Sequence, residues 1–220
     1  MDLEVPAAGV TCVLGPSGSG KTTLLRLCNR LAAPTDGIVR FRGVDVAGVD
    51  PLRLRRQVGM VFQRPVVFGG SVRDNLAVAA PGAGDDAYAE ALGKVELGPD
   101  LLRREAASLS GGEAQRMALA RTLITGPDAL LADEPTSSVD HATRSALERV
   151  ARELASAGVP LLWVTHDVRQ ARRLADRLVL VRSGVVIAAG TPDRLMRDPR
   201  SEIRSALAEH EEEEDGDGPG

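Results

Sequence analysis

The stretch GPSGSGKTT, residues 15–23, decides the fold of this chain. It fits the pattern G-x-x-x-x-G-K-[ST], in which glycines let the backbone wrap a polyphosphate and aim its N–H groups inward. Lys21 is expected to reach the β- and γ-phosphates, and the Thr22 hydroxyl to bind Mg²⁺. The sequence therefore predicts a phosphate-binding loop made of Gly15, Pro16, Ser17, Gly18, Ser19, Gly20, Lys21, Thr22 and Thr23.

The residues on either side of this loop supply the strand and the helix that the motif requires. Residues 9–15, GVTCVLG, form a short apolar run rich in β-formers. A helix is expected over 21–32, where apolar side chains recur at helical spacing, namely Leu24, Leu27, Cys28 and Leu31. The chain has 25 arginines and only two lysines, Lys21 and Lys94, and a compact ammonium suits a phosphate cradle. An ordinary Gly/Ser turn is the alternative that these features disfavour.

Length and composition are typical of one globular core with room for an inserted subdomain. The chain has 220 residues, of which 43% are hydrophobic and 26% charged. The net charge of −4 disfavours a general nucleic-acid binder, so no nucleic-acid partner is expected. No apolar run approaches the roughly 18–20 residues that cross a bilayer, and the first residues lack a leader pattern. Because Cys12 and Cys28 lie in apolar settings, we expect core thiols and a cytoplasmic protein.

Further along the chain, predicted strands alternate with predicted helices. Buried strands are expected at 128–133 and 160–166, helices at 141–158 and 167–176, and a hairpin at 177–190. The hairpin turns at Ser183–Gly184, residues 37–46 alternate like a half-exposed strand pair, and 85–124 is mostly helical. This alternation predicts an α/β fold with a mostly parallel sheet and helices on both faces.

The same pattern divides the chain into three parts. A core that contains the phosphate loop is predicted over 1–67 and 127–207, interrupted by a small helical subdomain over 68–126 that carries the segment LSGGEAQR. Residues 208–220 form an acidic low-complexity tail that has little to bury, so it is expected to be disordered.

Two adjacent carboxylates follow the strand ALLAD, residues 129–133. Ligands of open α/β sheets sit at the carboxyl ends of the strands, so Asp133 and Glu134 are placed to act on a bound phosphate. Asp133 is predicted to hold Mg²⁺, and Glu134 to accept a proton from the attacking water or to orient it. A solvated acidic turn is the alternative, and the nearby phosphate loop disfavours it.

Two further polar residues end predicted strands. His166 follows LLWVT and is expected at the same edge of the sheet, where it can contact the γ-phosphate or the water. Gln63 follows GMVF and can offer its amide oxygen to a metal or to water. A structural role is the alternative for each of them.

The segment LSGGEAQR, residues 109–116, places a glycine turn before a predicted helix. Free N–H groups and the positive end of the helix dipole make such a turn an anion site, although it contains no lysine. Ser110 and Glu113 also fit an S-x-x-E capping box, and the two interpretations are compatible.

Together these motifs resemble the ATP-binding cassette (ABC) ATPases, over about residues 5–190. Lys21 is similar to the family's phosphate-loop lysine, Gln63 to its glutamine loop and LSGGEAQR to its signature motif. LLADEPTSSVD, ending in Asp140, resembles the metal strand, the catalytic glutamate and the D-loop, and His166 resembles the switch histidine. The segments around Gln63 and His166 look most like compact cassettes of the phosphate-import and iron- or metal-export type.

The resemblance implies a P-loop NTPase core with a small antiparallel β part, which binds and hydrolyses ATP with Mg²⁺. In this family two cassettes pack head to tail, and the signature turn of one faces the γ-phosphate held by the other. The resemblance therefore implies that ATP is contacted by the phosphate loop and also by Ser110, Gly111, Gly112 and Asp140. It also implies a separate transmembrane permease as partner, at the inner face of the cell membrane.

Two features depart from the family pattern. The family stacks an aromatic residue from upstream of the phosphate loop on adenine, but the first aromatic residue here is Phe41. The stretch from Gln63 to Ser110 is also short, so the helical subdomain is expected to be small. The alternatives to a transporter subunit are a soluble ABC ATPase outside transport and a nucleotide-binding regulatory cassette with weak activity.

Overall fold

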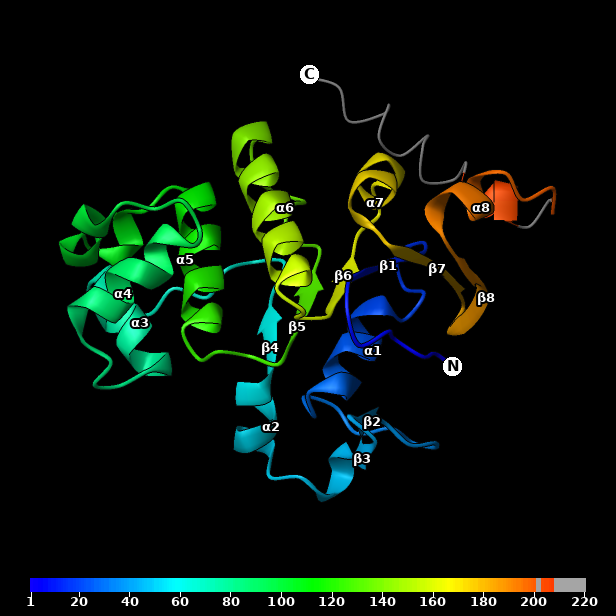
Figure 1. The fold of residues 1–220 in the computed structure, drawn as a ribbon, viewed down its shortest axis with the longest axis horizontal. Helices are drawn as coiled ribbons and strands as arrows, with labels where there is room; N and C mark the ends of the chain where they lie inside the picture. The colour runs from blue at the N-terminus through cyan, green and yellow to red at the C-terminus, as the bar shows by residue number, and fades with distance from the viewer. Residues whose placement is uncertain (201–202, 208–220) are drawn as a thin grey trace.

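A six-stranded sheet forms the centre of the computed structural model, which describes residues 1–200 and 203–207. The strands follow the order β4-β5-β6-β1-β7-β8, and all neighbours are parallel except β7 and β8. Their bounds are β1 Val10–Leu14, β4 Val58–Val61, β5 Ala129–Asp133, β6 Leu161–Val164, β7 Arg177–Arg182 and β8 Val185–Gly190. The mostly parallel α/β sheet predicted from the sequence is confirmed, and Figure 1 shows helices around it.

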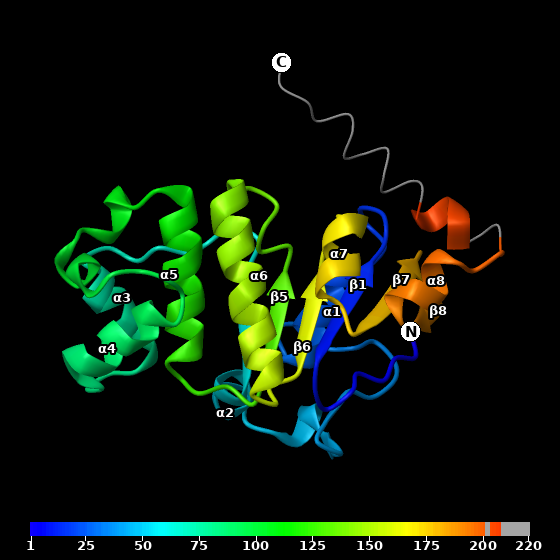
Figure 2. The ribbon, with the colours of Figure 1, turned by 45° about the horizontal axis from the view of Figure 1, so that its top comes forward.

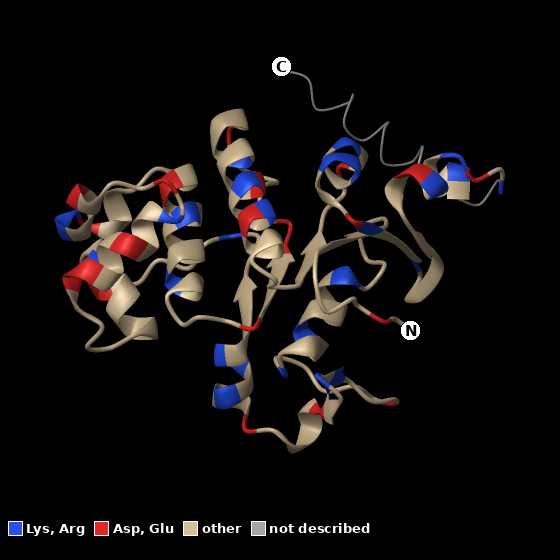
Figure 3. Ribbon diagram, in the orientation of Figure 1, with Lys and Arg blue, Asp and Glu red and all other residues tan. Residues whose placement is uncertain are grey.

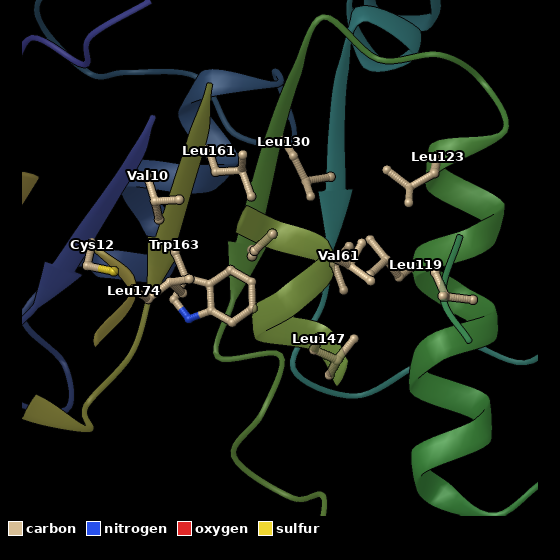
Figure 4. Packing of buried hydrophobic residues seen from close by; sticks show 14 of the residues in the cluster. Val10, Cys12, Val61, Leu119, Leu123, Leu130, Leu147, Leu161, Trp163 and Leu174 are labelled. Carbon is tan, nitrogen blue, oxygen red and sulfur yellow. The ribbon is translucent and has the colours of Figure 1, made fainter. Parts of the chain in front are cut away.

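The sheet is covered on both faces, as the apolar strands require. Leu161 and Trp163 of β6 pack into one hydrophobic cluster, while Leu162 and Val164 pack into another. The first cluster includes side chains of α5 (Gly111–Leu123), α6 (His141–Ser156) and α7 (Val168–Leu174), and Figure 4 shows its packing around Trp163. The second includes those of α1 (Lys21–Cys28) and α2 (Pro51–Gln57).

The helical segment lies beyond the edge strand β4 (Figure 1), and Figure 2 also shows it to one side of the sheet. It contains α3 (Val72–Ala79), α4 (Gly84–Gly93) and α5, with the short 3-10 turns η2 (Pro99–Arg103) and η3 (Ala106–Ser108). The helix α3 lies before residue 85, where the helical part was expected to begin, so it was not predicted. A capping box between Ser71 and Asp74 begins that helix.

Two local expectations need correction or refinement. The helix predicted over 21–32 ends at Cys28, because Arg30 adopts a left-handed φ of 56°. Leu31 is therefore 43% exposed, whereas Leu25 is fully buried. The strand pair predicted over 37–46 is shorter, with β2 at Arg40–Phe41 and β3 at Val44–Asp45, followed by η1 (Val46–Gly48).

The C-terminal part of the described chain packs back onto the core. The predicted hairpin is confirmed, and its turn residues Ser183 and Gly184 both have positive φ, 49° and 78°. After it come α8 (Pro192–Met196) and a helical stretch at 203–207 that buries Ile203 and Leu207. The predicted disordered tail, 208–220, lies outside the described residues.

Charged residues of both signs are distributed over most of the molecule (Figure 3). The helix α4 carries Asp85 and Asp86 in its first turn, whereas α2 carries Arg55 and Arg56 in its last turn. Within residues 1–200 and 203–207, the structure contains no helix that is both long enough and apolar enough to span a membrane.

Candidate functional site

The loop that follows β1 has the backbone shape of an anion cradle. Gly18 and Gly20 adopt left-handed φ angles of 77° and 97°, which glycine reaches without strain. A Cβ on Gly15 would lie 2.2 Å from the carbonyl oxygen of Val181, so only glycine lets the loop pack this closely on β7. A Cβ on Gly18 would meet no heavy atom within 4 Å, so the loop is open at this point.

The polar groups of the loop point inward. Lys21 is 7% exposed, and its Nζ donates hydrogen bonds to the carbonyl oxygens of Gly15 and Pro16, the latter at 3.0 Å. The hydroxyl of Ser19 is buried and has no hydrogen-bond partner within the described part of the chain. Gly20 caps α1 without a side chain, which leaves the first N–H groups of the helix open to the loop. A buried ammonium beside an unsatisfied hydroxyl and open N–H groups is suited to phosphate oxygens.

Thr22 and Asp133 form the second element of the site. The Thr22 Oγ1 donates to Asp133 Oδ1 at 3.0 Å, linking the start of α1 to the end of β5. Burial raises the pKa of the Asp133 carboxyl, and the hydrogen bond from Thr22 acts in the opposite direction. A buried carboxylate beside a hydroxyl is the oxygen donor set that Mg²⁺ accepts, together with substrate phosphates. Among the described residues, no group of three or more His, Cys, Asp or Glu could hold a metal ion alone.

Glu134 lies next to Asp133 but faces a different set of partners. Its Oε2 lies 3.1 Å from His166 Nδ1 and 3.4 Å from Gln63 Nε2. The Gln63 amide also donates to Ser137 Oγ at 3.3 Å. These three predicted residues thus meet at one point, at the carboxyl ends of β4, β5 and β6.

The two carboxylates are separated by backbone conformation. Glu134 has a φ of 44°, in the left-handed region that residues other than glycine seldom adopt. This turns its carboxylate toward His166 and Gln63 while the Asp133 carboxylate stays on Thr22. Because Gln63 presents its amide nitrogen to Glu134, the predicted contact of its oxygen with a metal remains a prediction.

The signature turn contains the capping box that its sequence suggested. Ser110 Oγ accepts from the Glu113 N–H at 3.2 Å, and Glu113 Oε2 accepts from the Ser110 N–H at 2.8 Å. This cap lowers the pKa of the Glu113 carboxyl, chiefly through the bond from the Ser110 backbone. In Figure 1, β4 and β5 lie between α1, which follows the phosphate loop, and α5, the helix that Ser110 caps.

Asp140 caps α6 beside the signature turn. Its Oδ1 accepts from the Thr143 N–H at 2.9 Å and its Oδ2 from the Thr143 hydroxyl at 3.0 Å. These bonds lower the pKa of the Asp140 carboxyl. A Cβ on Gly112 would lie 2.4 Å from Thr143 Oγ1, so the signature turn and the start of α6 are in close contact.

Sequence reasoning missed two residues of the site. Ser137 contacts Gln63, and its hydroxyl donates to the Glu134 carbonyl at 3.1 Å. Gln115 is 1% exposed and donates from Nε2 to the carbonyl oxygen of Phe62 at 3.0 Å. A polar residue on the buried face of a predicted helix was the signal available for Gln115, since a buried amide needs a partner.

The phosphate loop on a parallel sheet, with a Thr–Asp pair and a strand-end glutamate, defines a P-loop nucleoside triphosphatase. The model of the family described as "ABC transporter" matches residues 1–137, and the chain belongs to this family. Its relatives include proteins named as import ATP-binding proteins. This confirms the resemblance stated from the motifs.

The match to this chain covers different shares of the length of similar proteins. Protein STAR1 of Oryza sativa subsp. japonica is 44% identical over 200 residues, covering 89% of this chain and 58% of that protein. Phosphate import ATP-binding protein PstB 2 of Natronomonas pharaonis is 39% identical over 215 residues, covering 90% of this chain and 75% of that protein. The chain therefore spans little more than half of one relative and three quarters of the other.

Solved structures of ABC proteins share the fold. CbiO1 from Clostridium perfringens, part of the ABC transporter complex CbiONQ, superposes with a TM-score of 0.81 at 25% identity. The match covers 94% of this chain and 86% of that one. A bacterial Atm1-family ABC exporter with ATP bound gives a TM-score of 0.83 at 29% identity, covering 94% of this chain and 38% of that one.

Proposed function

We propose that the chain hydrolyses ATP with Mg²⁺ as one half of a head-to-tail dimer that drives a separate membrane permease. The observation that carries the proposal is the pair of adjacent carboxylates, one bonded to the phosphate-loop threonine and the other to His166 and Gln63. This arrangement supports a division of roles between the two carboxylates, in which one binds the metal ion and the other binds water, next to the phosphate loop.

The residues then divide the work as follows. The loop N–H groups, Ser19 and Lys21 bind the β- and γ-phosphates, and Lys21 exchanges its carbonyl partners for phosphate oxygens. Thr22 and Asp133 hold Mg²⁺, which neutralises charge on the phosphates when bound. Glu134 accepts the proton of the attacking water, and His166 holds that carboxylate in place.

A second copy of the chain completes the site. The capping box uses the N–H groups of Ser110 and Glu113, so those of Gly111 and Gly112 remain directed out of the helix start. Because β4 and β5 separate this turn from the chain's own phosphate loop, the anion it suits is a γ-phosphate held by a partner copy (Figure 1). Asp140, at the start of α6 beside that turn, then lies at the same dimer interface.

Coupling to transport requires a membrane partner. Relatives named as import ATP-binding proteins, and a neighbour named as part of the complex CbiONQ, support a cassette that acts with separate subunits. The protein would therefore work at the cytoplasmic face of the membrane, bound to its permease.

The first test changes the proposed proton acceptor. Glu134→Gln keeps the size of the side chain but cannot take a proton, so hydrolysis should slow by about 10²–10⁴-fold while ATP binding is retained. Glu90→Gln, an exposed carboxylate on α4, is the matched control and should hydrolyse ATP like the wild type. Wild-type turnover in Glu134→Gln would reject the assignment of the base.

The second test addresses the dimer. Lys21→Ala and Ser110→Arg are each expected to be inactive, since each damages both composite sites of a homodimer. In a mixed dimer one site combines both lesions and the other is intact, so mixing should restore ATP hydrolysis. If mixed dimers form and stay inactive, either the signature turn does not act in trans or both sites must be occupied. Repeating the mix with Glu134→Gln in place of Lys21→Ala distinguishes the two, because that variant still binds ATP; inactivity in both mixes would reject the action in trans.

A further inference from the structure

The helix that begins at the signature turn also holds the loop that carries Gln63. From α5, Gln115 Nε2 donates to the carbonyl oxygen of Phe62 at 3.0 Å. Two turns further along the helix, Arg121 Nη2 donates to the carbonyl oxygen of Val66 at 2.7 Å. Gln63 therefore lies between two backbone positions that are bonded to the same helix.

The Gln115 side chain is buried, and its contact with Phe62 is partly buried. Gln115 is 1% exposed, and its Oε1 is buried without a hydrogen-bond partner within the described part of the chain. A flip of the Gln115 amide would be unfavourable, because it would place Oε1 against the Phe62 carbonyl oxygen. The buried amide thus donates a hydrogen bond to the residue immediately before Gln63.

Downstream of Gln63 the loop is held from α3 as well. Asn75, which is fully buried, accepts from the Phe68 N–H at 2.9 Å and donates to the Phe68 carbonyl at 3.0 Å. The Arg121 guanidinium donates to Asn75 Oδ1 at 3.2 Å and lies 4.7 Å from the centre of the Phe68 ring. Residues 66–68 are therefore fixed to the helical part of the molecule rather than to the sheet.

The contact of Gln63 with the catalytic carboxylate is long by comparison. Its Nε2 lies 3.4 Å from Glu134 Oε2, near the limit of a hydrogen bond. A displacement of a few tenths of an ångström would therefore make or break this contact, whereas the Gln115–Phe62 bond has ordinary length. The helix α5 is the rigid partner, and the Gln63 side chain is the sensitive one.

We propose that Gln115 is a positioning residue. It sets the distance between the Gln63 amide and the Glu134 carboxylate according to the position of α5, the helix that Ser110 caps. Gln115 lies five residues after Ser110, about 7.5 Å along the helix axis, so both move with one rigid element. Binding of a partner's γ-phosphate at Ser110 is thereby transmitted to the chain's own catalytic carboxylate. This inference rests on the proposed function, in which Ser110 acts in trans and Glu134 accepts the proton.

The test is a double-mutant cycle on the full chain, with Gln115→Met, Gln63→Ala and the double variant. Methionine keeps the volume and the unbranched shape of the side chain but removes the donor. We expect Gln115→Met to lower kcat for ATP about fivefold, the loss of one neutral hydrogen bond, with unchanged binding of a fluorescent ATP analogue. In the Gln63→Ala background, the same change should lower kcat no further, because Gln115 acts through Gln63.

Met117→Leu is the matched control, since Met117 is a fully buried residue of the same helix and lies in the main hydrophobic cluster. It should keep the kcat of the wild type. Gln115→Asn, whose amide is too short to reach Phe62, provides a second variant with the same expected result if Gln115→Met does not fold.

The outcomes distinguish failure of the positioning role from failure of the proposed function. An unchanged kcat in folded Gln115→Met, or a fivefold loss that persists in the Gln63→Ala background, would overturn the positioning role. A wild-type chain that binds the ATP analogue but hydrolyses no ATP with Mg²⁺ would instead contradict the proposed function.

Discussion

Replacing Gly112 by alanine separates the packing role of the signature turn from its proposed role in binding phosphate. A Cβ at this position would lie 2.4 Å from Thr143 Oγ1 and 3.2 Å from Thr143 Cγ2. Thr143 cannot turn away freely, because its hydroxyl and its N–H are both bonded to Asp140. At Gly111, one residue earlier, a Cβ would meet no heavy atom within 4 Å.

The cost follows from two opposing terms. Overpacking typically destabilises by about 1–3 kcal/mol, and the better helix propensity of alanine offsets up to about 1 kcal/mol. The expected net loss is therefore about 1–2 kcal/mol in the free energy of unfolding. For a chain of this size each kcal/mol corresponds to about 2–4 °C in Tm, so Gly112→Ala should melt about 2–8 °C below the wild type.

Thermal unfolding followed by circular dichroism measures this difference, with Gly111→Ala as the control. Gly111→Ala should melt at or slightly above the wild-type temperature, and Thr143→Ala should relieve most of the cost of Gly112→Ala. If Gly112→Ala melts at the same temperature as Gly111→Ala, the close approach of the signature turn to α6 is wrong. ATP hydrolysis gives the second readout: if the turn binds γ-phosphate, both alanine variants lose activity although only one loses stability.

Three further predictions concern the nucleotide site. Lys21→Ala should lose tight ATP binding in a fluorescence titration, because the phosphate charge is left uncompensated; wild-type affinity would contradict the loop assignment. Asp133→Asn should abolish Mg²⁺-dependent hydrolysis yet melt above the wild type at neutral pH without metal. Burial raises the folded pKa of Asp133, so its ionised form is penalised, and the difference in Tm should disappear as the pH falls below the carboxyl range. ATP and GTP should bind to the chain of residues 1–220 with similar affinity, since none of residues 1–14 is aromatic and able to stack on the base; strong preference for ATP would contradict this.

The phosphate loop and the strand-end carboxylates could be predicted from sequence because their geometry is local. The glycines with left-handed φ, the lysine and the threonine are consecutive, and the Thr22–Asp133 bond follows from placing one strand beside another. The capping box at Ser110 is equally local. Motifs of this kind carry most of their geometry in their spacing.

Short helices and their ends were harder to predict. The helix α2 has a recognised start signal, with Asp50 as its cap and Pro51 at the first position, but it is only seven residues long. The helix α1 ends early because Arg30 adopts a left-handed conformation. Glycine usually occupies such a position, so the sequence carries no glycine signal for this helix end. The spacing of the apolar residues predicted a helix that includes Leu31, whereas the helix ends at Cys28.

The orientation of Gln63 could not be predicted because it depends on packing across the molecule. It requires Gln115 on Phe62 and Asn75 on Phe68, contacts between residues that are 53 and 7 positions apart. The sequence placed Gln63 at the end of a strand, but only the position of α5 determines which way its amide faces. The same holds for Ser137, whose place beside Gln63 depends on the turn after β5.

The backbone at Glu134 links the conformation of the site to its chemistry. A left-handed φ costs a non-glycine residue about 1–2 kcal/mol, and glycine would adopt it freely. The turn is held by the Glu134 N–H bonded to the Val164 carbonyl at 3.1 Å and by two bonds from Ser137 to the Glu134 carbonyl. Since these bonds involve only the Glu134 backbone, a glycine would satisfy them equally well. The backbone conformation therefore does not explain a glutamate at this position. Its contacts with His166 and Gln63, away from the Asp133 carboxylate, support the proposed role of Glu134 as the proton acceptor.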